Sequence, residues 1–182
     1  LVGRFRGVLA QVNVVQSIIF ASMSGSALAD AAASGKLMQS LMTRDGKYTP
    51  AYAAALTTVS SVIGPIMPPS IPLVLYALVS DTSVGYLFLG GVIPGLLLGV
   101  VQSGLIAFTA KRRNFPVEER VPLRALPGIT WRAVPALLMP VILLGCLYGG
   151  ITTPTEAAAV AAAYALLISA VLYRSIRIKD VY

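Results

Sequence analysis

The chain has no histidine and a single cysteine, Cys146, among its 182 residues. Without histidine it cannot form a Ser-His or Cys-His catalytic pair, a histidine-ligated metal site or an imidazole proton relay. One cysteine cannot form a disulfide within the chain or supply a Cys-x-x-Cys metal site. The glycine-rich patterns that hold nucleotides are also missing. We therefore expect no enzyme activity and no cofactor.

Hydrophobic residues make up 57% of the sequence, charged residues only 12%, and mean hydropathy is +0.81. Soluble domains are roughly 45–50% apolar and about 25% charged, so the composition predicts an all-α integral membrane protein. Fourteen Lys and Arg residues against seven acidic ones give a net charge of +7. Because these basic residues stand between apolar runs, they indicate topology in a lipid bilayer rather than a nucleic-acid partner.

Four apolar regions have the length of membrane segments: 7–42, 50–79, 84–110 and 133–173. Lys and Arg occur before the first region, between the first two, in the connector 111–132 and after the fourth, whereas the gaps at 80–83 and 149–155 have none. By the positive-inside rule, the basic segments, including the connector, are cytoplasmic and the neutral gaps face the other side. The chain would then be multi-pass, with one span at 84–110 and an antiparallel pair within 133–173.

The first region is too short for two full spans, although both of its ends are predicted to be cytoplasmic. Two spans need about 40 residues and a turn, whereas this region has about 36. Its middle reads Ser-Met-Ser-Gly-Ser, and its second arm contains several polar residues. Such residues favour surroundings of protein or water. We predict a re-entrant helical hairpin over 7–42, with its tip at Ser24–Ser26 near mid-membrane.

The second region, 50–79, contains a proline-rich interruption. Thr49 and Pro50 predict a helix start. Four prolines and a glycine between Gly64 and Pro72 cannot continue that helix. We therefore predict a discontinuous transmembrane helix that ends near Ile63 and resumes near Pro69.

Two further patterns concern helix packing and helix starts. Gly91, Gly95 and Gly99 form a small-residue stripe suited to close packing in the third region. Thr153 and Glu156 form a predicted capping box at the start of the last span.

Backbone groups left unpaired at mid-membrane cost several kcal/mol each unless something satisfies them. Carbonyl and hydroxyl oxygens suit a hard cation such as Na⁺, and helix N-termini suit an anion. Broken helices of this kind mark binding sites in secondary transporters. The predicted sodium ligands are Ser24, Gly25, Ser26, Ser60, Ser61, Gly64 and Pro65. The predicted contacts of an organic anion are Ser26, Pro68, Pro69 and Ser70.

Asp30 is an acidic residue inside the first apolar region, where function is the default expectation. It also lies just past a predicted helix start, where the helix dipole favours a carboxylate. Two roles therefore stay open for it: part of an ion pathway, or a helix-start and packing residue.

Three segments resemble the large membrane subunit of TRAP transporters (tripartite ATP-independent periplasmic, DctM-type). They are Ser-Gly-Ser-Ala-x-Ala-Asp-Ala-Ala-Ala at 24–33, Tyr-x-Pro-Ala-Tyr at 48–52 followed by the serine- and proline-rich stretch 60–72, and Gly-Gly-Ile-Thr-Thr-Pro-Thr-Glu at 149–156. The resemblance covers nearly the whole chain, in order.

The resemblance implies sodium-driven import of organic acids, such as C4-dicarboxylates and sialic acid, across the bacterial inner membrane. A periplasmic substrate-binding protein would deliver the substrate, and a small four-helix membrane subunit would complete the complex. The family's large subunit has two inverted repeats and an elevator mechanism, and it is more than twice as long. We therefore expect this chain, which begins with Leu1, to be a piece of a longer one.

Two other functions compete with transport. The first is a membrane scaffold that organises partners without transporting anything. The second is an intramembrane enzyme, in which a serine without histidine would need a lysine base. Lys36 is the only lysine candidate in a hydrophobic region.

Overall fold

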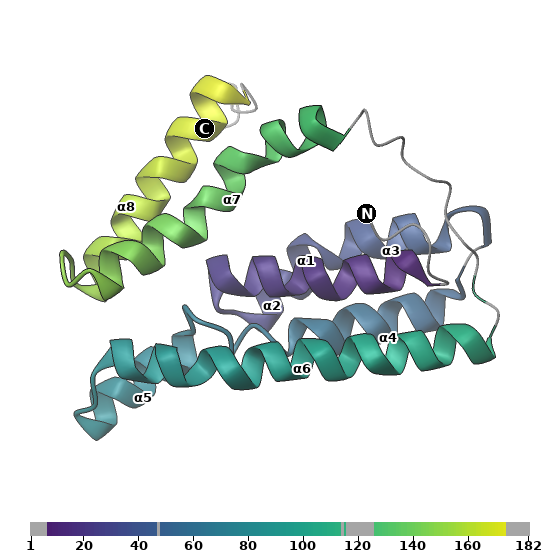
Figure 1. The fold of residues 1–182 in the computed structure, drawn as a ribbon, viewed down its shortest axis with the longest axis horizontal. Coiled ribbons are helices and arrows are strands. Elements are labelled where there is room, and N and C mark those ends of the chain that lie inside the picture. The colour runs from purple at the N-terminus through teal and green to yellow at the C-terminus, as the bar shows by residue number, and fades with distance from the viewer. Residues whose placement is uncertain (1–6, 47, 114, 116–125, 174–182) are drawn as a thin grey trace. The chain divides into compact units, whose positions relative to one another are not determined.

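The computed structural model describes residues 7–46, 48–113, 115 and 126–173, and those residues form helices and turns without any strand (Figure 1). The all-helical class predicted from composition is confirmed. The chain divides into two compact units, Leu1–Val121 and Pro122–Tyr182, which we call the N-terminal and C-terminal units. Predictions that fall on residues 1–6, 47, 114, 116–125 and 174–182, including most of the connector and several topology-setting basic residues, lie outside the described part.

The N-terminal unit begins with two helical arms that pack against each other. Helix α1 spans Val8–Ser24, and the chain reverses at Gly25, which has a left-handed φ of 62°. The returning arm consists of α2 (Ala27–Ala33) and α3 (Gly35–Thr43). The sequence predicted an arm on each side of this turn, but it did not predict the interruption of the second arm at Ser34.

The next segment is the interrupted helix. Helix α4 spans Pro50–Ser61 and α5 spans Ile71–Ser80, so residues 62–70 are not helical. Thr49 and Ser70 cap the two helices by accepting hydrogen bonds from the backbone N–H groups three residues later, each at 3.3 Å. The interruption predicted from the prolines is therefore present, although each helix end is displaced by two residues from its predicted place.

Helix α6, Val84–Arg112, brings its glycine stripe against this interruption and against α1. A Cβ atom on Gly91 would lie 2.6 Å from the carbonyl oxygen of Ile66, and one on Gly95 would lie 2.9 Å from the sulfur of Met67. A Cβ atom on Gly99 would lie 2.6 Å from a methyl carbon of Ile18. The predicted role of the stripe in close packing is confirmed.

The C-terminal unit is a helical pair, α7 (Leu126–Tyr148) and α8 (Pro154–Leu167), with a π-helical turn at Ile168–Leu172. Helix α7 begins inside the segment expected to be a connector. The predicted capping box is present, since the Glu156 carboxylate accepts from the backbone N–H of Thr153 at 2.8 Å, while the Thr153 hydroxyl accepts from the N–H of Glu156.

Two helices within the described residues are long and apolar enough to cross a bilayer: Val84–Arg112 and Pro154–Leu172. This criterion rests on length and composition alone. Helix α6 has 29 residues, so at about 1.5 Å per residue it exceeds the roughly 30 Å hydrocarbon core of a bilayer. It also exposes large apolar side chains over most of its length, among them Leu89, Ile93, Leu97, Val100, Leu105 and Phe108.

Candidate functional site

The turn between α1 and α2 touches the interruption between α4 and α5. A Cβ atom on Gly25 would lie only 2.1 Å from the carbonyl oxygen of Pro69 and 3.0 Å from the Cα of Ser70. A Cβ atom on Gly64 would lie 3.0 Å from the backbone nitrogen of Ala27. Glycine is therefore required for this approach of backbone to backbone. Two non-helical segments far apart in the sequence form one junction.

Four helix ends meet at this junction. Helices α1 and α4 end there, at Ser24 and Ser61, while α2 and α5 begin there, after Ser26 and Ser70. The last carbonyl groups of a helix have no intrahelical partners and form its negative pole, whereas the first N–H groups form its positive pole. The junction therefore offers oxygen ligands to a cation and N–H donors to an anion.

The two serines at the end of α4 are both buried. Ser60 is fully buried, and its hydroxyl donates to the carbonyl of Leu56 at 2.7 Å and accepts from the side-chain amide of Asn13 at 2.8 Å. The hydroxyl of Ser61 donates to the carbonyl of Thr58 at 2.8 Å. A hydroxyl oxygen has two lone pairs, so Ser60 retains one and Ser61 retains two that could face a cation.

The other predicted serines hold the non-helical backbone in place. The Ser26 hydroxyl caps α2 by accepting from Ala29 N–H at 3.3 Å, and the Ser24 hydroxyl accepts from the N–H of Ser26 at 3.4 Å. Ser70 caps α5, and its hydroxyl also donates to the carbonyl oxygen of Pro65 across the interruption. Each hydroxyl thus satisfies backbone groups that the helix ends leave open.

The predicted proline contacts lie on the same segment. Pro68 is buried and Pro69 is half-buried, and the peptide bond between them is cis. The carbonyl of Pro69 is the group that approaches Gly25. The predicted ligands of the sodium ion and of the anion therefore belong to the turn or to the interrupted helix. These two segments approach each other at Gly25 and Gly64.

Asp30 is fully buried on α2. One carboxylate oxygen accepts a hydrogen bond from the Ser34 hydroxyl, and the other has no hydrogen-bond partner among the described residues. The Ser34 hydroxyl also donates to the Asp30 backbone carbonyl at 2.8 Å.

All the buried polar side chains of the described residues lie in the hairpin and the interrupted helix: Asn13, Ser17, Asp30, Ser34, Thr57, Ser60, Ser61 and Ser70. Asn13, Ser17 and Thr57 were not predicted from the sequence to belong to this set. Asparagine inside an apolar run is a signal that could have found Asn13. Thr57 accepts a hydrogen bond from the side-chain amide of Gln39 at 3.0 Å, and no local pattern predicts that contact.

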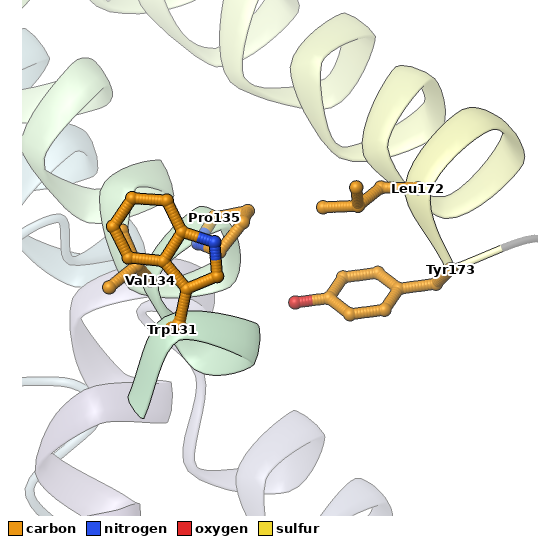
Figure 2. A pocket seen from close by; sticks show the side chains of 5 residues that line it. All are labelled: Trp131, Val134, Pro135, Leu172 and Tyr173. Carbon is orange, nitrogen blue, oxygen red and sulfur yellow. The ribbon is translucent and has the colours of Figure 1, made fainter. Parts of the chain in front are cut away.

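A cavity of about 500 Å³ lies in the C-terminal unit (Figure 2). The side chains that line it come from α7 and from the end of the last helix: Trp131, Val134, Pro135, Leu172 and Tyr173. None of the predicted site residues takes part in it. The lining of this mostly apolar cavity therefore shares no residue with the polar junction.

The sequence model of one protein family, described as tripartite ATP-independent periplasmic transporter, DctM component, matches residues 1–182. The chain belongs to this family. The family is one of transporter permeases rather than enzymes. The alternative of a Ser/Lys enzyme also lacks geometric support, because the proposed lysine base, Lys36, is exposed on α3.

Individual relatives carry more detailed names. The chain is 44% identical over 179 residues to the sialic acid TRAP transporter large permease protein SiaM of Vibrio cholerae. It is 41% identical over 179 residues to the C4-dicarboxylate TRAP transporter large permease protein DctM of Pseudomonas aeruginosa. Both matches cover 98% of this chain but 42% of the relative. The chain thus spans about two-fifths of these DctM-family proteins.

Proposed function

We propose that this chain is part of a sodium-coupled permease that imports an organic acid anion across the bacterial inner membrane. The observation that carries the proposal is the contact of the turn at Gly25 with the interruption at Pro69. It brings two helix C-termini and two helix N-termini to one point. In a bilayer such a junction is favourable when ions satisfy its backbone groups.

In this proposal the sodium ion lies among the carbonyl groups of 24–26 and 60–65 and the hydroxyls of Ser60 and Ser61. The anion lies beside it, near Ser26 and 68–70, where α2 and α5 present N–H groups. Oxygen ligands suit Na⁺, and the positive poles of helices suit a carboxylate. Each ion would favour the arrangement in which the turn is closed over the interruption, which is the differential affinity that coupling requires.

The placement of the segments in the membrane belongs to the same proposal. Residues 7–42 would form a re-entrant hairpin and residues 50–79 a discontinuous span, both in a moving transport domain. Residues 84–110 would form a further span. Residues 133–173 would open a second, inverted repeat as part of a scaffold. Family membership supports the proposed elevator motion, the small four-helix subunit and the periplasmic binding protein. The proposed substrate class is supported by the relatives, which include sialic acid and C4-dicarboxylate permeases.

The test is sodium-dependent uptake by the complete transporter in proteoliposomes, with Ser61→Ala as the variant. Ser61 makes its hydrogen bond within its own helix, so alanine removes a proposed ligand with little other disturbance. We expect the sodium concentration for half-maximal uptake to rise several-fold. Thr58→Ala is the matched control, since Thr58 is exposed and bonds its own helix backbone in the same way.

An unchanged sodium response in both Ser61→Ala and Ser60→Ala would contradict the proposed ion site. The non-transporting scaffold would be favoured if uptake also needed no sodium and continued when this protein was left out of the complex.

A further inference from the structure

The unpaired oxygen of Asp30 is the feature of the structure that the proposed function leaves unexplained. Its side chain has no exposed surface, and one of its two carboxylate oxygens has no partner among the described residues. A buried charge without a partner is among the most costly features a protein interior can contain.

The surroundings of Asp30 follow from two contacts on either side of it. Ala27, one turn before Asp30, has its backbone nitrogen against Gly64, and Gly35, just past Ser34, lies with its Cβ position 3.9 Å from the Cβ of Thr57. In the segment 27–34, Asp30 and Ser34 are buried, Ala27 and Ala31 are half-buried, and residues 28, 29, 32 and 33 are exposed. Asp30 therefore lies level with the last turn of α4, which ends at Ser61.

No positive charge in these helices balances Asp30. Helix α2 packs against α1, α3 and α4, and the only other charged residue in these four helices is Lys36, which is exposed. The last turn of α4 is the negative pole of that helix, so it repels a carboxylate. A cation beside Asp30 would be attracted both by the carboxylate and by the carbonyl groups that end α4.

We propose that Asp30 provides the fixed negative charge of the sodium site, with its unpaired oxygen directed to an ion held at the end of α4. Ser34 positions the carboxylate through the hydrogen bond that its hydroxyl donates to one carboxylate oxygen. This inference rests on the proposed function, and it adds an anionic ligand to a site otherwise made of neutral oxygens. It also makes binding of the ion depend on a charge rather than on backbone geometry alone.

The test measures ion binding directly, without substrate. The complete transporter, purified in detergent, is melted across a sodium chloride series held at constant ionic strength with choline chloride. An ion that binds the folded state raises its melting temperature as the concentration passes the dissociation constant. We expect Asp30→Asn to raise the sodium concentration for half-maximal stabilisation by at least about tenfold. Asp81→Asn is the matched control, because Asp81 is an exposed acid at the end of α5.

Asparagine has the shape of an uncharged carboxyl group, so the variant separates the two roles of Asp30. A sodium response in Asp30→Asn equal to that of the wild type overturns the inference and leaves Asp30 as a neutral packing residue. Loss of the response in Asp81→Asn as well also overturns it. An absent sodium response in the wild-type protein instead contradicts the proposed function itself.

If Asp30→Asn does not fold, Ser34→Ala is the variant that tests the inference. It keeps the charge and removes only the hydroxyl that holds it. We expect several-fold weaker sodium binding in this variant, and an unchanged affinity contradicts the inference.

Discussion

Gly25 shows at the scale of one residue how the junction depends on the absence of a side chain. Its φ of 62° is one that L-amino acids rarely adopt, and a Cβ atom would overlap the carbonyl oxygen of Pro69. Gly46 has a similar φ of 67° with nothing within 4 Å of its Cβ position. Alanine at either glycine therefore carries the same backbone strain, roughly 1–2 kcal/mol, but only at Gly25 does it force two backbones apart.

We expect Gly25→Ala to reduce sodium-dependent uptake strongly and to lower the melting temperature more than Gly46→Ala does. The additional cost of the overlap is about 1–3 kcal/mol. The measurements are uptake in proteoliposomes and thermal melting of the purified transporter. Equal effects of the two substitutions would mean that the turn does not need to touch the interruption.

Single residues were predictable from the sequence where they break a pattern. Ser60, Ser61 and the prolines stand out because an apolar span does not need them. The structure places Pro69 against the turn at Gly25 and Gly64 against Ala27. Asn13 and Thr57 were missed because their importance comes from partners on other helices, Ser60 and Gln39. Contacts of this kind depend on how helices pack, which local spacing does not encode.

The glycine stripe of α6 makes a prediction at the scale of one helix. Gly91 lies against the Ile66 carbonyl, whereas its neighbour Gly90 has open space within its own unit. We expect Gly91→Ala to destabilise the protein by about 1–3 kcal/mol through overlap. Gly90→Ala should instead stabilise it by about 0.5–1 kcal/mol, because alanine favours a helix. Thermal melting of the complete transporter measures both, and shifts of the same sign would contradict the packing described for α6.

The helices themselves were largely predictable, but their ends were less so. A single proline does not always end a helix, since Pro94 lies inside α6 and Pro135 and Pro140 lie inside α7. Four prolines and a glycine within 64–72 remove too many backbone donors for a helix to continue, so the gap between α4 and α5 could be seen in the sequence. Its limits at Ser61 and Ile71 depend on Ser70, which caps α5 and bonds Pro65 across the gap. At the interruption near Ser34, the serine hydroxyl donates to a backbone carbonyl of its own helix. Serine is too common in helices for its presence to predict an interruption.

Topology is a property of the whole molecule, and it follows from where the basic residues lie. The charged end of α6 at Lys111 and Arg112 is predicted to be cytoplasmic, while Thr82 and Ile151 belong to the neutral gaps that face the other side. All three positions that would be labelled, Thr82, Lys111 and Ile151, are exposed. Cys146 is the only cysteine among these 182 residues, so the background for chemical labelling carries Cys146→Ser and has serine at any cysteine elsewhere in the complete transporter.

In that background, Thr82→Cys and Ile151→Cys should react with a membrane-impermeant maleimide added to the periplasmic side of intact cells. Lys111→Cys should react only after the membrane is permeabilised. The reason is that α6, at 29 residues, is long enough to place its two ends on opposite sides of a roughly 30 Å hydrocarbon core. Labelling of Thr82→Cys and Lys111→Cys from the same side would exclude α6 as a span. Labelling of Ile151→Cys only after permeabilisation would place Ile151 on the cytoplasmic side. That result would contradict the topology predicted from the positive-inside rule.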